Sequence, residues 1–205
     1  MSIATVLFSA YLMGSIPSAV WLGTLIYGVD VRQHGSRNSG ATNTFRVLGK
    51  GLGFTVLFMD ILKGFLAIQL AAIVLHDHPK FMLISILTGC LCVLGHVYSI
   101  FLKFKGGKGV ATSLGVFLAL NPYPALVCFA IFILILLLTH YVSLASLITA
   151  SLLPGICYAF FHQVEWTYVL FNGFIACLVL FTHRKNIQRL YQGCEPKMNF
   201  SKPKA

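Results

Sequence analysis

The chain has 205 residues, of which 58% are hydrophobic and 10% are charged, and its mean hydropathy is +0.84. Since a soluble domain carries about 25% charged residues, this composition excludes a water-soluble globule and indicates an integral membrane protein. The formal net charge is +10, and the positions of the basic residues favour membrane orientation, not nucleic-acid binding, as its cause.

Seven apolar runs are predicted to be membrane-spanning helices, because a helix needs about 20 apolar residues to cross a bilayer. The first run lacks the basic start of a signal peptide and is expected to be a retained span. The fourth is short and is expected to be a half-span packed inside the bundle. No linker or internal repeat appears, so residues 1–205 are expected to form one membrane-embedded domain. In chain order, the runs cover residues 2–27, 52–75, 81–102, 110–120, 124–139, 143–161 and 166–182.

With seven spans, the Lys and Arg residues gather on one side of the membrane, while Lys80 lies on the other and Lys63 lies inside the second span. The positive-inside rule makes the basic side cytoplasmic, with the N-terminus outside and the C-terminus in the cytoplasm. Six spans, the alternative, would split the basic loops between the two faces. The cytoplasmic set is Arg32, Arg37, Arg46, Lys50, Lys103, Lys105, Lys108, Arg184, Lys185, Arg189, Lys197, Lys202 and Lys204.

The first polar segment on this side, residues 35–46, is rich in hydroxyls and amides and contains two arginines suited to bidentate phosphate binding. The other interpretation is an ordinary cytoplasmic loop of turn residues with orienting arginines. The candidate site residues in this segment are Ser36, Asn38, Thr42, Asn43 and Arg46.

The second polar segment, residues 104–112, places glycines and lysines immediately before the expected helix 110–120. Glycines let backbone N–H groups approach a ligand, and a helix start favours negative charge. A Walker A nucleotide loop is excluded, because Gly109 follows Lys108 and Leu102 stands where a glycine is required. The segment therefore indicates phosphate binding without a nucleotide, or else a simple turn with orienting lysines. Its candidates are Lys105, Gly106, Gly107, Lys108, Gly109 and Thr112.

The third polar segment begins at His183 and ends at Glu195. If the last helix extends past the membrane, His183 and Asn186 share one face, since they are three positions apart. A basic membrane-flanking stop signal is the alternative, although His183, Asn186 and Glu195 exceed what such a signal needs.

Within the second span, Asp60 and Lys63 are expected to pair, either for function or to hold the bundle together. His96 and His140 are expected to be structural. Only five acidic residues occur, which argues against a pair of carboxylates as general acid and base. No Gly-x-Ser-x-Gly elbow or His-x4-Asp motif appears, and the cysteines lack zinc-site spacing, so neither a metal nor a cofactor is expected.

Together and in this order, the three segments resemble the motifs of the bacterial acyl-phosphate:glycerol-3-phosphate acyltransferase family (PlsY) of small integral membrane enzymes. The resemblance covers nearly the whole chain. Arg37 stands where glycine is common, and His140 stands where arginine is frequent. The matching residues are Gly35, Ser36, Asn38, Gly40, Ala41, Thr42, Asn43 and Arg46; Gly95, His96, Phe101 and residues 104–112; and His183, Arg184, Asn186, Ile187, Arg189, Leu190, Gly193 and Glu195.

This resemblance implies a transferase that moves a fatty acyl group from acyl phosphate to the sn-1 hydroxyl of glycerol 3-phosphate. The products would be lysophosphatidic acid and phosphate, in phospholipid biosynthesis. The implied partners are glycerol 3-phosphate, acyl phosphate, membrane lipid and other enzymes of phospholipid synthesis, with no nucleic acid. The implied location is the bacterial cytoplasmic (inner) membrane, with the active site on the cytoplasmic face.

The resemblance also implies roles for individual residues. Catalytic roles fall to Ser36, Arg46, Lys108, His183 and Asn186. Substrate binding falls to Asn38, Thr42, Asn43, Lys105, Gly106, Gly107, Gly109, Thr112 and Ser143. Structural roles are expected for Glu195 and, from their place in the second span, for Asp60 and Lys63. The competing interpretation from another class is a transporter or channel for phosphate or organophosphate that uses the same basic mouth.

Overall fold

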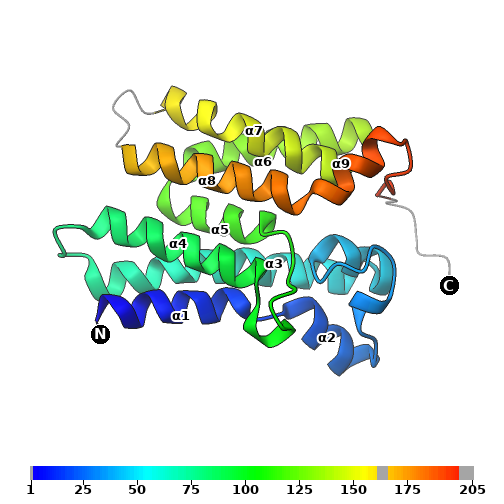
Figure 1. Ribbon diagram of the computed structural model, residues 1–205, viewed down its shortest axis with the longest axis horizontal. Coiled ribbons are helices and arrows are strands. Elements are labelled where there is room, and N and C mark those ends of the chain that lie inside the picture. The colour runs from blue at the N-terminus through cyan, green and yellow to red at the C-terminus, as the bar shows by residue number, and fades with distance from the viewer. Residues whose placement is uncertain (1, 161–165, 199–205) are drawn as a thin grey trace. The chain divides into compact units, whose positions relative to one another are not determined.

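The computed structural model describes residues 2–160 and 166–198, and in these ranges every regular element is helical (Figure 1). The described residues divide into two compact units, one ending at Ala119 and the other starting at Leu120. The expectation that the chain forms a single domain stays a prediction.

The first apolar run, expected to be one helix over residues 2–27, is broken. α1 (Ile3–Ser15) and α2 (Ser18–Tyr27) meet at an angle of 44°. Pro17 lies at the break, where it cannot donate a backbone N–H to a continuing helix. The Ile16 carbonyl oxygen lies at this break and accepts the Ser18 N–H over 3.1 Å.

The helix of the second run is longer than expected. α3 (Ala41–Leu75) begins at Ala41, not at Leu52, and therefore includes the second half of the first polar segment. The Thr44 hydroxyl donates to the Gly40 carbonyl oxygen over 3.2 Å, which ties the first turn together. Gly49 bends the helix by adopting a φ of +84°, a conformation that glycine takes without steric cost.

The remaining helices of the first unit are α4 (Phe81–Val97), the short η2 (Ile100–Leu102) and α5 (Val110–Leu120), besides the three-residue η1 (Val31–Gln33) before α3. Helices α1, α3 and α4 lie side by side (Figure 1). Glycine permits this close approach: a Cβ on Gly14 would lie 1.9 Å from the Cys92 carbonyl oxygen, and one on Gly95 would lie 2.2 Å from that of Tyr11. Small residues at helix contacts are typical of packing in membranes.

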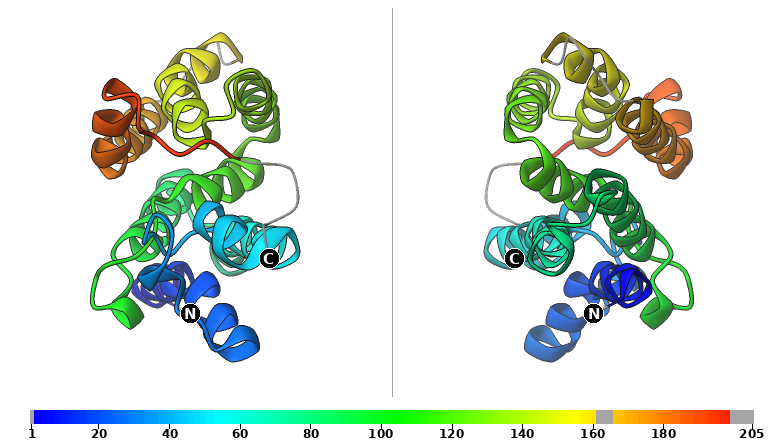
Figure 2. Two further views of the ribbon diagram at one scale, coloured as in Figure 1. Left: turned by 90° about the vertical axis from the view of Figure 1, so that its right-hand side faces the viewer. Right: turned by 90° about the vertical axis from the view of Figure 1, so that its left-hand side faces the viewer.

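The second unit contains α6 (Pro122–Thr139), α7 (Val142–Phe160), α8 (Trp166–Thr182) and α9 (Arg184–Tyr191). Helix α7 packs against both α6 and α8, as the end-on views of Figure 2 show. Helices α8 and α9 meet at 58°. The predicted end of the sixth span, Phe161, lies outside the described residues, as do Lys202 and Lys204.

By length and composition, four described helices are able to cross a membrane, and the two bent pairs, α1 with α2 and α8 with α9, raise this number to as many as six. Helix α5 is apolar but short, with the bounds predicted for the fourth run. The prediction of an all-helical chain is confirmed for the described residues, whereas the seven-span count stays a prediction.

Candidate active site

One apolar cluster anchors both polar segments of the first unit. Val31 precedes the first segment, Ala41 lies within it, and Leu102 lies two positions before the glycine-rich loop. All three are buried in one cluster with residues of α2 and α3. The burial of this shared core fixes where the two segments leave the bundle.

Asn43 organises the first polar segment from within. Its Oδ1 accepts hydrogen bonds from the Ser36 backbone N–H over 2.8 Å and from the Ser36 hydroxyl over 3.1 Å. Its Nδ2 donates to the carbonyl oxygens of Val31, over 2.7 Å, and His34, over 3.1 Å. Asn43 is fully buried, so its amide holds the segment in place and sets the position of the Ser36 hydroxyl.

The conformation at position 37 explains why glycine is common there, although this chain has Arg37. Its φ is +58°, in the left-handed region that favours glycine, and glycine is common at this position. Further along, Thr42 and Arg46 are half-buried and stand one helical turn apart near the start of α3, on one face.

The glycine-rich loop folds back onto the end of α4. The N–H of Gly106 donates to the Val97 carbonyl oxygen over 2.9 Å, and that of Gly107 donates to the His96 carbonyl oxygen over 3.0 Å. A Cβ on Gly106 would lie only 2.0 Å from the same His96 oxygen. Glycine is therefore required here by the close approach of two backbones.

Gly109 connects this loop to α5. Its φ is +84°, and its carbonyl oxygen accepts the Ser113 N–H over 2.8 Å. Lys108 lies half-buried just before the helix start, and Lys105 is exposed. Thr112 is fully buried in the first turn of α5, and its hydroxyl has no hydrogen-bond partner among the described residues. Positive charge, a helix start and backbone N–H groups thus occur together, as an anion site requires.

In the second unit, a C-terminal cap turns the chain back after α9. Gly193 has a φ of +69°, its N–H donates to the Leu190 carbonyl oxygen over 3.1 Å, and the Cys194 N–H donates to that of Arg189 over 2.9 Å. These two bonds form a Schellman motif, which places a glycine in the left-handed conformation after the helix. The turn brings Glu195 back toward α9.

Glu195 connects three polar side chains. Its Oε1 accepts from the Ser143 hydroxyl over 2.7 Å and from Asn186 Nδ2 over 2.6 Å, while its Oε2 accepts from Arg189 Nε over 2.7 Å. Burial acts to raise the pKa of the Glu195 carboxyl, but the hydrogen bonds from Arg189, Asn186 and Ser143 outweigh it and hold the pKa below its ordinary value. Glu195 is therefore a buried carboxylate whose negative charge is balanced by the Arg189 guanidinium.

His183 is buried where α8 ends and α9 begins. Its Nδ1 lies 2.8 Å from the Val179 carbonyl oxygen. Because a carbonyl oxygen can only accept, Nδ1 carries a proton, which makes Nε2 the acceptor in the neutral form of the ring. The Asn186 N–H donates to the His183 carbonyl oxygen over 2.8 Å, so the two residues belong to the same first turn.

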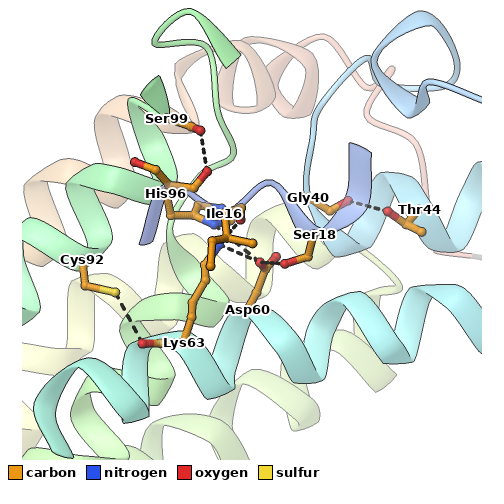
Figure 3. Close-up of polar contacts among 10 residues, drawn as sticks. Ile16, Ser18, Gly40, Thr44, Asp60, Lys63, Cys92, His96 and Ser99 are labelled. Carbon is orange, nitrogen blue, oxygen red and sulfur yellow. Dashed lines mark hydrogen bonds and ion pairs between the residues drawn. The ribbon is translucent and has the colours of Figure 1, made fainter. Parts of the chain in front are cut away.

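Asp60 and Lys63 form the buried ion pair expected from the sequence, with Nζ and Oδ1 2.8 Å apart (Figure 3). Sequence reasoning gave His96 only a structural role and did not single out Ser18. Both lie at this pair: His96 Nδ1 is 3.7 Å from Asp60 Oδ1, and the Ser18 hydroxyl donates to that oxygen over 3.3 Å. The sequence feature that could have pointed to His96 is its place in the second motif. No sequence feature points to Ser18, because it lies within an apolar run.

The predicted site residues therefore form two groups. Those of the first and second segments, with Asp60 and Lys63, belong to the first unit, and Ser143, His183, Asn186 and Glu195 belong to the second. Asn38 is half-buried between Ser36 and Gly40 in the first group. Among the described residues, no group of three or more His, Cys, Asp or Glu side chains is arranged to hold a metal ion.

Comparison with known proteins covers almost the whole chain. The family model described as "Glycerol-3-phosphate acyltransferase" matches residues 4–193. A protein of Fusobacterium nucleatum subsp. nucleatum with the same description is 48% identical over 193 residues, which cover 93% of this chain and 95% of the relative.

Two solved structures share the fold. Both are crystal structures of PlsY, described as an integral membrane glycerol 3-phosphate acyltransferase. The glycerol 3-phosphate form has a TM-score of 0.88 at 39% identity, and the lysophosphatidic acid form has a TM-score of 0.85 at 38% identity. Each match covers 97% of this chain and 96% of the solved one. The similarity to these integral membrane proteins extends over nearly their whole length, so this chain is a multi-pass membrane protein.

Proposed function

Because this chain belongs to the glycerol-3-phosphate acyltransferase family, we propose that it transfers a fatty acyl group from acyl phosphate to the sn-1 hydroxyl of glycerol 3-phosphate. The products are 1-acyl-glycerol 3-phosphate (lysophosphatidic acid) and inorganic phosphate. The observation that carries the proposal is the glycine-rich loop, whose backbone is fixed by the carbonyl oxygens of His96 and Val97 with Lys108 at the start of α5. This is a phosphate site without the features of a nucleotide site.

The reaction depends on the alignment of the two substrates and on stabilisation of developing negative charge more than on a strong base. The substrate hydroxyl oxygen attacks the acyl carbonyl carbon, the bond from this carbon to the phosphate oxygen breaks, and the electron pair leaves with phosphate. Phosphate is a good leaving group, so the barrier lies in alignment and in the negative charge on the carbonyl oxygen. A phosphate oxygen of the substrates accepts the hydroxyl proton, since only five acidic residues occur in the chain.

We assign the residues to the two substrates by charge and position. Lys108, with the backbone N–H groups at the start of α5, holds the phosphate of glycerol 3-phosphate. Ser36 and Arg46 bind the acyl phosphate head group and polarise its carbonyl. The supporting residues of the glycerol 3-phosphate site are Lys105, Gly106, Gly107, Gly109 and Thr112, and those of the acyl phosphate site are Asn38, Thr42 and Asn43. In the second unit, His183 and Asn186 are assigned catalytic roles, Ser143 a substrate-binding role and Glu195 a structural role.

The membrane setting follows from the distribution of charge. Seven spans, with the N-terminus outside and α5 as the short one, place all three polar segments on the cytoplasmic face of the inner membrane. A membrane-impermeant maleimide tests this arrangement. The thiol of exposed Cys194 should react only after the cells are permeabilised, whereas a cysteine introduced by Asp77→Cys should react in intact cells. The reverse pattern would exclude this topology.

Purified protein in lipid, given acyl phosphate and labelled glycerol 3-phosphate, tests the activity. We expect labelled lysophosphatidic acid, acylated at sn-1, and release of phosphate. Acyl-CoA or acylated acyl carrier protein, given in place of acyl phosphate, should not support product formation. Uptake of the label into sealed vesicles without product would instead indicate the transporter. Ser36→Ala, Arg46→Ala and Lys108→Ala should each abolish product formation without unfolding the protein. Lys80→Ala, at the exposed start of α4, is the control that should not.

A further inference from the structure

Asp60 and Lys63 are an ion pair whose burial gives little stability by itself. Asp60 is 2% exposed and Lys63 is 6% exposed, and both lie on α3. Removing an ion from water costs several kcal/mol, so an apolar pair of similar size is often as stable or more so. Holding the bundle together is therefore a weak explanation for placing these two charges here.

The pair contacts the break between α1 and α2. Lys63 Nζ donates to the Ile16 carbonyl oxygen over 3.0 Å, and the Ser18 hydroxyl donates to Asp60 Oδ1 over 3.3 Å (Figure 3). Ile16 is the residue that follows the last residue of α1, and Ser18 is the first residue of α2. The ion pair therefore has a defined orientation, fixed by groups from another segment.

His96 lies between this pair and the glycine-rich loop. On one side its Nδ1 is 3.7 Å from Asp60 Oδ1. On the other side its Nε2 would lie 2.2 Å from a Cβ placed on Gly107, so the loop backbone rests directly against the imidazole edge. The His96 carbonyl oxygen also accepts the Gly107 N–H over 3.0 Å. Gly107 is therefore held by both the ring and the backbone of His96.

The same turn of α3 supports the other end of the loop. A Cβ on Gly64, next to Lys63, would lie 2.2 Å from the Thr112 carbonyl oxygen. A Cβ on Gly115 would lie 1.9 Å from the Ile61 carbonyl oxygen. The first turns of α5, which follow the loop, thus rest on the α3 turn that contains the ion pair. The α3 turn that contains Asp60 and Lys63 therefore supports both ends of the loop, through His96 at one end and through α5 at the other.

We propose that Asp60, Lys63 and His96 are positioning residues for the glycine-rich loop, so that they set the affinity for the phosphate of glycerol 3-phosphate without touching it. The identity of this ligand rests on the function proposed above. The geometry of the loop, which the proposal concerns, does not. A purely structural pair would affect unfolding alone, whereas a positioning cluster affects binding at this one phosphate.

Two substitutions of His96 separate its two contacts. In His96→Asn the amide nitrogen takes the place of Nδ1 and keeps the contact with Asp60, while the edge against Gly107 is lost. In His96→Gln the amide nitrogen takes the place of Nε2 and the contact with Asp60 is lost. Both variants should raise KM for glycerol 3-phosphate by about tenfold or more, because small displacements of a binding group are costly. The KM for acyl phosphate should stay within about twofold of the wild-type value, since the loop is not its site.

The double variant Asp60→Leu/Lys63→Met removes both charges together and avoids leaving one of them unpaired. It should unfold at or above the wild-type temperature, as apolar replacements of buried pairs often do, and still raise KM for glycerol 3-phosphate. Thr88→Val is the matched control on α4: it removes a buried hydrogen bond to the Ile84 carbonyl oxygen and should lower the unfolding temperature without changing either KM.

Amide hydrogen exchange at Gly106 and Gly107 provides a readout that needs no ligand. Both N–H groups donate to α4 carbonyl oxygens, so their exchange should accelerate in His96→Gln and in the double variant, but not in Thr88→Val. If wild-type protein fails to acylate glycerol 3-phosphate, the proposed function fails and this measurement still decides the positioning role. Unchanged exchange with an unchanged KM, or equal changes in Thr88→Val, would overturn it.

Discussion

Asn43 uses its whole hydrogen-bonding capacity on the first polar segment and holds Ser36 by two bonds. Oδ1 accepts from both the N–H and the hydroxyl of Ser36, and Nδ2 donates to the carbonyl oxygens of Val31 and His34. An asparagine amide has two acceptor sites and two donors, so all four are engaged within the protein. In the site proposed above, Asn43 therefore acts by positioning Ser36, since its amide has no hydrogen-bonding position left for a substrate.

Asn43→Asp tests this role with a change of almost no volume. Aspartate keeps the acceptor for Ser36 but places a carboxylate oxygen against two carbonyl oxygens, where Asn43 donated. We expect the free energy of unfolding to fall by about 2–3 kcal/mol, and kcat/KM to fall with it, as measured by thermal unfolding and product formation in lipid. Asn121→Asp is the control, since Asn121 precedes α6 without a capping bond; equal effects of the two substitutions would contradict the role.

Arg37→Gly should stabilise the protein. Arg37 is exposed and has a φ of +58°, and the left-handed conformation costs about 1–2 kcal/mol for a residue with a Cβ. We expect the free energy of unfolding to rise by about 1 kcal/mol with acyl transfer unchanged. Arg37→Ala keeps the strain and removes the charge, so it should not stabilise. If both variants lose activity equally, the guanidinium has a role in the site.

Gly106→Ala should weaken glycerol 3-phosphate binding. Its Cβ would lie 2.0 Å from the His96 carbonyl oxygen, so the loop must move away from α4. We expect KM for glycerol 3-phosphate to rise about tenfold or more, and KM for acyl phosphate to change little. Gly173→Ala in α8 is the control, because a Cβ there meets no atom within 4 Å. Comparable KM values for wild type and Gly106→Ala would show that the loop does not hold this substrate.

The elements that the sequence predicted well are those delimited by local chemistry. Helix α5 has the predicted bounds, 110–120, because Gly109 and Asn121 stand at the two ends of a continuous apolar run. The start of α3 was predicted too late, because its first turns consist of the polar residues of the first segment. The broken first span follows from Pro17, which a count of apolar residues does not detect.

Polar contacts between residues far apart in the chain were harder to predict from the sequence. Gly193 signals a helix end, but nothing local indicates that the chain then returns Glu195 to Ser143, 52 positions away. The contact of His96 with Asp60 likewise joins two apolar helices whose packing depends on glycines. Such pairs require the tertiary arrangement, whereas the spacing of Asp60 and Lys63 on one helix was sufficient to predict their ion pair.

Glu195 should make stability depend on acidic pH. The pKa of its carboxyl is held below the ordinary value, so the folded state favours the carboxylate. Its contribution to stability is fully present above the ordinary glutamate pKa of about 4.3 and is lost as the pH falls through the lowered value in the folded state. At neutral pH we expect Glu195→Gln to reduce the free energy of unfolding by about 1–3 kcal/mol.

Thermal unfolding of both proteins in lipid, measured from pH 7 down to pH 3, checks the sign. The wild-type advantage should be constant from pH 7 to about pH 5 and shrink below the ordinary glutamate pKa of about 4.3, as the carboxylate of Glu195 is protonated and its bond with Arg189 weakens. Asp77→Asn is the control, because Asp77 is exposed and should leave the profile unchanged. An advantage that grows on acidification would mean that Glu195 is protonated in the folded state, contrary to the three donors that surround it.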